Sequence, residues 1–230
     1  MLIATGIAFV LLVKDDRATG KKGTTSHTLN LDRKRVIWLL TLFMTAILAG
    51  GLTFNIVTIA MPKVIDERLG LPVPLAVTGW LTTSIFFCGA LTQIVVGRLV
   101  DRFELPVIFV GLALLQFSGL VISAATVGLP MAMGLTLVTA AIYGQVVVND
   151  AMIGRYVPDE FRNRIYSVRF FIGFTVGGMA VPIIGALHRV GGFGEVLMVT
   201  AAIAAVIFAC ALATWLLSRG RTQRAAAPAE

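Results

Sequence analysis

Charged residues are scarce in this sequence. Only 13% of the 230 residues are Asp, Glu, Lys or Arg, whereas 57% are hydrophobic and the mean hydropathy is +0.91. A soluble domain of this length cannot remove so much apolar side-chain area from water. The composition therefore predicts an integral membrane protein with several spans.

Cysteine and histidine are also rare. Cys88 and Cys210 lie far apart in separate apolar stretches, which excludes a disulfide framework and a metal-ligand spacing. His27 lies in a polar segment and His188 at the end of an apolar stretch, and no acidic pair lies within such a stretch. A membrane-embedded enzyme needs clustered catalytic groups. We therefore expect no enzyme, no catalytic residue, no metal and no other cofactor.

Six long apolar stretches make up most of the chain. As helices with a rise of about 1.5 Å per residue, they are long enough to cross about 30 Å of hydrocarbon. They lack the alternating pattern of β-barrel strands. We predict an all-α membrane protein whose single domain, residues 36–217, is a six-transmembrane-helix bundle with spans at 36–61, 76–97, 105–125, 130–154, 168–187 and 196–217.

The two ends of the chain differ from this domain. Residues 1–13, MLIATGIAFVLLV, are apolar but too short to span a bilayer, and KDDR follows them where a secretory signal has a cleavage site. We expect them to be a truncated transmembrane helix. Residues 14–35 are polar and predict a cytoplasmic linker, and residues 218–230 predict a cytoplasmic disordered tail.

The basic residues indicate an orientation. With six alternating spans, all but three of the 19 lysines and arginines fall on one side of the membrane, the exceptions being Lys63, Arg68 and Arg189. The side rich in Lys and Arg faces the cytoplasm. We therefore expect a plasma (cytoplasmic) membrane protein with a cytoplasmic C-terminus. The formal net charge of +7 is spread over several loops, which argues against a nucleic-acid partner.

The connection between the second and third spans carries a motif, VGRLVDRFELP, at residues 96–106. Gly97, Asp101 and Arg102 match a Gly-x-x-x-Asp-Arg pattern at the end of a span. This pattern resembles the loop signature of the major facilitator superfamily. The chain departs from the longer family motif after Phe103, a departure that is common in the C-terminal half of such transporters.

A second resemblance covers residues 155–185, RYVPDEFRNRIYSVRFFIGFTVGGMAVPIIG. This segment is similar to the connection between the tenth and eleventh helices of the same family, followed by its glycine-rich eleventh helix. The whole chain then resembles the end of helix six, the central cytoplasmic loop and helices seven to twelve. The family likeness implies two inverted three-helix repeats within the bundle.

The resemblance implies a function and its partners. The expected function is secondary active transport of a small solute by alternating access, with this chain as the C-terminal half. The expected partners are the lipid bilayer, the small-molecule solute, and either a missing N-terminal six-helix half or a second copy of the chain. The alternative is a truncated or non-transporting integral membrane subunit that keeps the half-fold.

The motif residues also suggest a conformational latch. The family likeness places Asp101 near the start of the fifth span, where Arg164 and Arg169 are candidates for ion pairing. Such contacts would join the cytoplasmic helix ends in one conformation and part in the other. The alternative is a solvated loop whose arginines only set the topology. The latch candidates are Gly97, Asp101, Arg102, Arg164 and Arg169.

Amide side chains are the main polar groups inside the spans. Asn55, Gln145 and Asn149 are candidates for lining a substrate cavity, and Gln145 and Asn149 share a helix face because they are four residues apart. Hydrogen bonding between helices is the alternative. We favour that alternative for Gln93 and Gln116.

Asp150 is the one acidic residue well inside a span. A carboxylate there is a candidate for coupling transport to protons. A structural anion paired with Arg155 or Arg164 is the other interpretation, and the position near the end of the span favours it.

The fifth span is rich in small residues. Gly173 and Gly177 form a G-x-x-x-G pair, and Gly178 and Pro182 follow. Small residues allow helix backbones to approach closely and proline bends a helix. We predict helix packing at these four positions.

Overall fold

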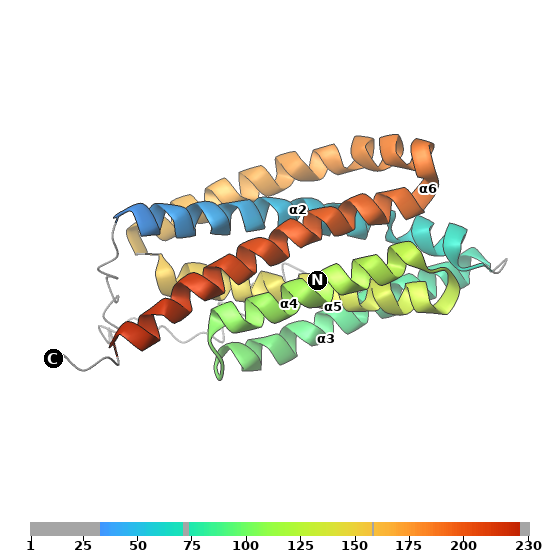
Figure 1. Cartoon of the computed structure of the whole chain (residues 1–230). Coiled ribbons are helices and arrows are strands. Elements are labelled where there is room, and N and C mark those ends of the chain that lie inside the picture. Colours follow the sequence, from blue (N-terminus) through green and yellow to red (C-terminus); the bar gives the residue numbers. More distant parts are fainter. Residues whose placement is uncertain (1–32, 71–73, 158, 226–230) are drawn as a thin grey trace, which may run out of the picture. The chain divides into compact units, whose positions relative to one another are not determined.

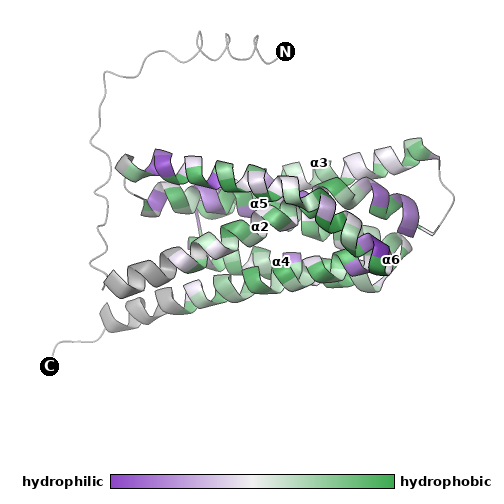
Figure 2. Cartoon of the chain, turned by 90° about the horizontal axis from the view of Figure 1, so that it is seen from above, coloured by the Kyte–Doolittle hydropathy of each residue, from purple (hydrophilic) through white to green (hydrophobic). Residues whose placement is uncertain are grey.

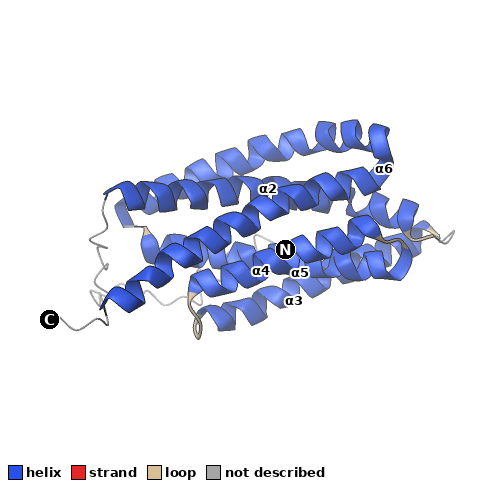
Figure 3. Cartoon of the chain, viewed as in Figure 1, coloured by secondary structure: helices blue, strands red, loops and turns tan. Residues whose placement is uncertain are grey.

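The computed structural model describes residues 33–70, 74–157 and 159–225, which form helices joined by short loops (Figure 3). The predictions for residues 1–13, for 14–32 of the linker and for the last five residues of the tail lie outside these ranges. The helices are α2 (Arg33–Arg68), α3 (Leu75–Val100), α4 (Leu105–Ala125), α5 (Gly128–Tyr156) and α6 (Asp159–Ala225).

The helices follow the apolar stretches of the sequence. In the described part of the chain, five helices are long and apolar enough to cross a membrane. α4 has the predicted bounds, and α2, α3 and α5 contain the predicted spans and extend beyond them by a few residues. Pro106 lies in the first turn of α4, where its missing N–H leaves no helical hydrogen bond unmade. Figure 2 shows the most hydrophilic residues mainly toward the ends of the helices.

The longest helix, α6, contains two spans joined by a tight turn. Gly191 (φ −145°, ψ 20°) and Gly192 (φ 66°, ψ −163°) leave the helical conformation, and the chain reverses direction there (Figure 1). We call residues 159–190 the first arm and residues 193–225 the second arm. The two predicted spans fall in separate arms. The second arm stays helical to Ala225, which differs from the disordered tail that we predicted from residue 218.

Two clusters of buried side chains hold the helices together. α6 packs against α2 and α4, and α5 packs against α3 and α4. One cluster joins α2, α3, α4, α5 and both arms of α6, and it includes Ile65, Met131 and Leu197. The other lies toward the α3–α4 connection and includes Phe109 and Ile207. The second arm contributes to both clusters.

The helices α4 and α5 cross at two glycines. A Cβ atom on Gly119 would lie 2.9 Å from the Gly134 carbonyl oxygen, and one on Gly134 would lie 2.8 Å from the Gly119 carbonyl oxygen. The Ser123 hydroxyl donates to the Gly119 carbonyl at 2.8 Å. Only glycine allows this approach of two backbones. This crossing was not predicted from the sequence.

An arginine caps the end of α4. Arg68 donates from its guanidinium to the carbonyl oxygens of Ser123, Ala124 and Thr126 at 2.9–3.1 Å. The last carbonyls of a helix lack helical partners and carry partial negative charge. Arg68 therefore fixes the end of α2 to the end of α4.

Candidate substrate pocket

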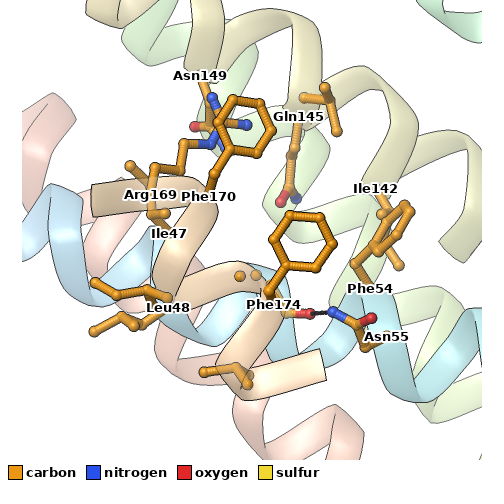
Figure 4. Close-up of a pocket in the computed structure, with 16 residues that line it drawn as sticks. Ile47, Leu48, Phe54, Asn55, Ile142, Gln145, Asn149, Arg169, Phe170 and Phe174 are labelled. Atoms are coloured by element: carbon orange, nitrogen blue, oxygen red, sulfur yellow. Dashed lines mark hydrogen bonds between the residues drawn. The ribbon is translucent and has the colours of Figure 1, made fainter. Parts of the chain in front are cut away.

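A pocket with a volume of about 300 Å³ lies between α2, α5 and the first arm of α6 (Figure 4). Its wall includes residues 47–55 in the middle of α2 and residues 142–149, which run from the middle of α5 toward its C-terminal end. Residues 169–176 of α6 form the remaining wall. Most of the lining side chains are aliphatic or aromatic, with a few polar groups among them.

The three predicted cavity residues, Asn55, Gln145 and Asn149, all line this pocket. Gln145 donates from Nε2 to Oε1 of Gln116 at 2.6 Å, which joins α5 to α4. Asn55 donates from Nδ2 to the Gly51 carbonyl at 2.8 Å. Asn149 Oδ1 is buried and has no hydrogen-bond partner among the described residues. Gln145 and Asn55 thus form hydrogen bonds within the protein and also line the pocket. Asn149 has a hydrogen-bonding atom that no described residue uses.

Aromatic rings line the pocket beside these amides. Phe54 comes from α2, and Phe170 and Phe174 come from the first arm of α6. The ring centroids of Phe54 and Tyr143 lie 6.1 Å apart. The two α6 rings were not predicted from the sequence, although their spacing of four residues beside Gly173 indicates that they share a helix face.

The four small-residue positions of the first arm have different surroundings. Gly173 lines the pocket, and a Cβ atom there would meet no atom within 4 Å. A Cβ atom on Gly177 would lie 2.9 Å from Asn55 Oδ1, so the helix passes close to α2 at that point. Gly178 has open space around it, and Pro182 is exposed. The close helix contact is therefore confined to Gly177.

An ion pair lies at one end of the pocket. The guanidinium of Arg169 on the first arm donates to Asp150 Oδ1 on α5. Arg169 also lines the pocket, whereas Asp150 does not. Arg155 and Arg164 were the predicted partners of Asp150, whereas in the structure its partner is Arg169.

The structure does not assemble the predicted latch. In the described residues Asp101 forms no ion pair with Arg164 or Arg169, and Arg169 is paired with Asp150 instead. Asp101 and Arg102 are exposed in the connection after α3, and a Cβ atom on Gly97 would meet no atom within 4 Å. A different residue joins these helix ends.

That residue is Arg155. Its Nη2 donates to the carbonyl oxygen of Val100, the last residue of α3, at 3.0 Å. The end of α5 is thereby fixed to the end of α3 without an acidic side chain.

The opposite end of the first arm contacts α2 through a histidine. His188 Nε2 lies 3.1 Å from Glu67 Oε2, and Lys63 Nζ lies 3.7 Å from Glu67 Oε1. The His188 ring also packs on Phe193, with 4.4 Å between the ring centroids. Across the described part of the chain, no three His, Cys, Asp or Glu side chains are grouped closely enough to hold a metal ion.

Comparisons with known proteins identify the architecture. A family model described as Major Facilitator Superfamily matches residues 43–230. The fold is similar to that of a major facilitator superfamily transporter, FucP, in the outward conformation, with 19% sequence identity and a TM-score of 0.67 over 92% of this chain and 52% of that one. A variant of the E. coli fucose:proton symporter FucP gives 18% identity and a TM-score of 0.66 over the same shares. No curated protein matches the sequence. The chain thus spans about half the length of the solved transporters that it matches.

Proposed function

Because the chain belongs to the major facilitator superfamily, a family of membrane transporters, we propose that it forms one six-helix unit of a secondary active transporter for a small solute. The pocket between α2, α5 and the first arm of α6 carries this proposal. Transporters of this architecture bind their substrates near the middle of the membrane, between two such units. The lining residues in the middle turns of α2 and of the first arm support a site of this kind.

Alternating access requires a second unit. The fucose:proton symporter that shares this fold is about twice as long as the chain. We propose that either an N-terminal six-helix unit or a second copy of the chain completes the cavity. Rocking of the two units would open the cavity to each side in turn. The open space around Gly173 and Gly178 leaves room for such movement along the first arm.

We expect the protein to lie in the plasma membrane with its C-terminus in the cytoplasm. The support is the distribution of the basic residues, because the rich side faces the cytoplasm. A reporter fused after Arg224 that works only in the cytoplasm should therefore be active. Activity of a reporter that works only outside the cytoplasm would reverse this orientation.

Cysteine labelling tests access to the pocket. With Cys88 and Cys210 replaced by alanine, a Gly173→Cys variant places a thiol where there is free space. Thiols react as thiolates, which need water around them. We expect a membrane-impermeant maleimide to label this variant from outside in right-side-out vesicles and from inside in inverted vesicles. Labelling from one side alone would contradict alternating access.

A matched variant makes the labelling specific. Gly111 on α4 is exposed and also has free space around it, but it lies outside the pocket. We expect Gly111→Cys, facing lipid, to remain unlabelled from both sides. If Gly111→Cys reacts as fast as Gly173→Cys, the labelling reports general exposure and the proposed cavity loses its support.

The alternative is a membrane subunit that keeps the half-fold and does not transport. The chain covers only 52% of the solved transporter, which is the observation that keeps this alternative open. An antibody against the C-terminal tail would measure the mass of the native protein in its own membrane. A band near twice the 24.5 kDa of this chain supports a two-unit transporter in one polypeptide. A band at 24.5 kDa leaves a dimer of this chain or the non-transporting subunit, which the labelling experiment separates.

A further inference from the structure

The pocket contains one charged side chain among the described residues that line it, the guanidinium of Arg169. Its partner, Asp150, lies beside the pocket and does not line it. The arginine therefore faces two ways, toward a carboxylate of its own chain and toward the space that a solute would occupy. Figure 4 shows Arg169 and Asn149 together at one end of the pocket.

The Asp150–Arg169 pair is only partly covered. The Asp150 side chain is 49% exposed and that of Arg169 is 19% exposed. Neither side chain is enclosed by the protein, and neither belongs to the two buried clusters that hold the helices together. A second anion that reaches the guanidinium from the pocket can therefore replace Asp150 without breaking the fold.

Asn149 adds a second polar group at this end. Its buried Oδ1 has no partner among the described residues, although most buried polar atoms in proteins have one. The other polar atom of this amide, Nδ2, is a hydrogen-bond donor on a residue that lines the pocket. An acidic group with two or three oxygens could accept hydrogen bonds from both Arg169 and Asn149. The planar guanidinium of arginine suits such groups, because it can donate two parallel hydrogen bonds.

The other residues that line the pocket are mostly apolar, which favours a ligand whose remaining part is apolar. Phe54, Phe174 and Ile142 surround the space away from Arg169, and the ring of Phe170 lies beside the arginine. A volume of about 300 Å³ is at the small end of ligand pockets and suits one ring or a short chain. The pocket therefore combines a cationic end with an apolar body.

Charge balance links this ligand to a proton. While Asp150 is ionised, it neutralises Arg169 and repels an entering anion. After Asp150 takes up one proton, Arg169 carries an unpaired positive charge that one anion neutralises. One proton and one monoanion thus enter together with no net charge.

The other charged groups near Asp150 add no second acidic partner for Arg169. On α5, Arg155 donates to the Val100 carbonyl, and on the first arm Arg162 donates to the Gly154 carbonyl. Arg164 on the same arm is exposed, and the described side chains of α2 carry no charge before Lys63. Asp150 is thus the one acidic group that these observations place against Arg169.

We infer that the pocket binds an organic monoanion with an apolar body through Arg169 and Asn149, and that protonation of Asp150 frees Arg169 to bind it. This inference rests on the proposed transport function and names the substrate class and the proton site of the same pocket. Its consequence is cotransport of one proton with one anion.

Binding of benzenesulfonate to the full chain in lipid nanodiscs tests the inference. This probe stays ionised at every pH used, so any pH dependence comes from the protein. We expect its affinity to rise as the pH is lowered from about 7.5 to about 5.5, by up to about tenfold per pH unit, because one proton is taken up with each bound anion. Benzenesulfonamide, a neutral molecule of nearly the same shape, should bind more weakly and show no such rise.

Three variants make the test specific. Asp150→Asn should bind benzenesulfonate tightly at both pH values, because its Arg169 is always free. Arg169→Gln should lose the binding, and Arg169→Lys should retain part of it, which separates loss of the cation from misfolding. Arg189→Gln, which removes an exposed arginine at the far end of the same arm, should behave as the unmodified chain.

Three results would overturn the inference: benzenesulfonate that does not bind, binding that is independent of pH in the unmodified chain, or equal affinity for the neutral sulfonamide. The proposed transport function is judged separately by the labelling of Gly173→Cys from the two sides. If that labelling occurs and the anion does not bind, the chain transports a different class of solute. If neither is seen, both the transport function and the inference fail.

Discussion

The two arms of α6 are both apolar helices, but their surroundings differ. In the second arm, side chains such as Leu197 and Ile207 are at most 2% exposed and belong to the two buried clusters. In the described side chains of the first arm, Ala180 is the one buried hydrophobic residue, whereas Phe171 and Phe174 are 74% and 81% exposed. The second arm thus holds the bundle together, and the first arm presents its side chains to the pocket, to lipid or to another protein unit.

This difference separates packing from function along one continuous helical segment. The first arm contributes Arg169, Phe174 and Gly173 to the pocket and touches α2 closely at Gly177. Because few of its side chains are held by the core, it can shift with a small loss of packing energy. Rocking transporters need an element of this kind beside the substrate.

The largest difference between the two arms is expected in the free energy of unfolding, when one side chain in each arm is truncated to alanine. Leu197→Ala removes a side chain that is 2% exposed, and Met179→Ala removes one that is 57% exposed. The unfolded chain stays in an apolar environment, so the loss comes mainly from packing contacts. We expect Leu197→Ala to reduce the free energy of unfolding by about 2 kcal/mol or more, and Met179→Ala by less than about 1 kcal/mol.

Titration with SDS in mixed micelles, followed by circular dichroism, measures both free energies. Equal losses for the two variants would mean that the first arm is held as firmly as the second arm. The comparison between the arms would then fail.

An intermediate effect is expected at the turn between the arms. Gly192 has φ 66° and ψ −163°, a conformation that is essentially restricted to glycine, so Gly192→Ala should reduce the free energy of unfolding by about 1–3 kcal/mol. Gly185 lies inside the first arm with no atom near its missing Cβ, and Gly185→Ala should stabilise the helix by up to about 1 kcal/mol. The same SDS titration compares them, and a Gly192→Ala variant of unchanged stability would show that the turn does not need glycine.

Hydropathy predicted most of the fold, because the length of a membrane-spanning helix is set by the thickness of the bilayer. The bounds of α4 were predicted to the residue, and the spans of α6 were placed in the correct arms. The tight turn at Gly192 was not predicted, since its conformation depends on how the two arms pack together. The crossing at Gly119 and Gly134 was missed for the same reason: each glycine is ordinary in its own helix, and only the partner helix makes it necessary.

The pocket was predicted in part. Asn55, Gln145 and Asn149 were selected because amides inside an apolar span need a partner or a cavity, and the structure places them around one pocket. Arg164 and Arg169 were the two candidates for pairing with Asp101. The sequence places Asp101 and Asp150 near the same ends of their helices, so it does not decide which carboxylate reaches this arginine. The contact with Asp150 depends on the rotation of α5 against the first arm.

The smallest effect is expected where the first arm meets α2 at its other end. His188 lies 3.1 Å from Glu67, and the two side chains are 37% and 38% exposed. Solvent screening at this exposure limits the pair, and we expect a double-mutant cycle with His188→Gln and Glu67→Gln to give a coupling energy below about 0.5 kcal/mol that falls further in high salt. Lys63→Gln is the matched control, because it removes the other partner of Glu67 within α2 alone. A coupling of several kcal/mol would mean that this contact fixes the first arm to α2, and the arm would then lack the freedom that the comparison assigns to it.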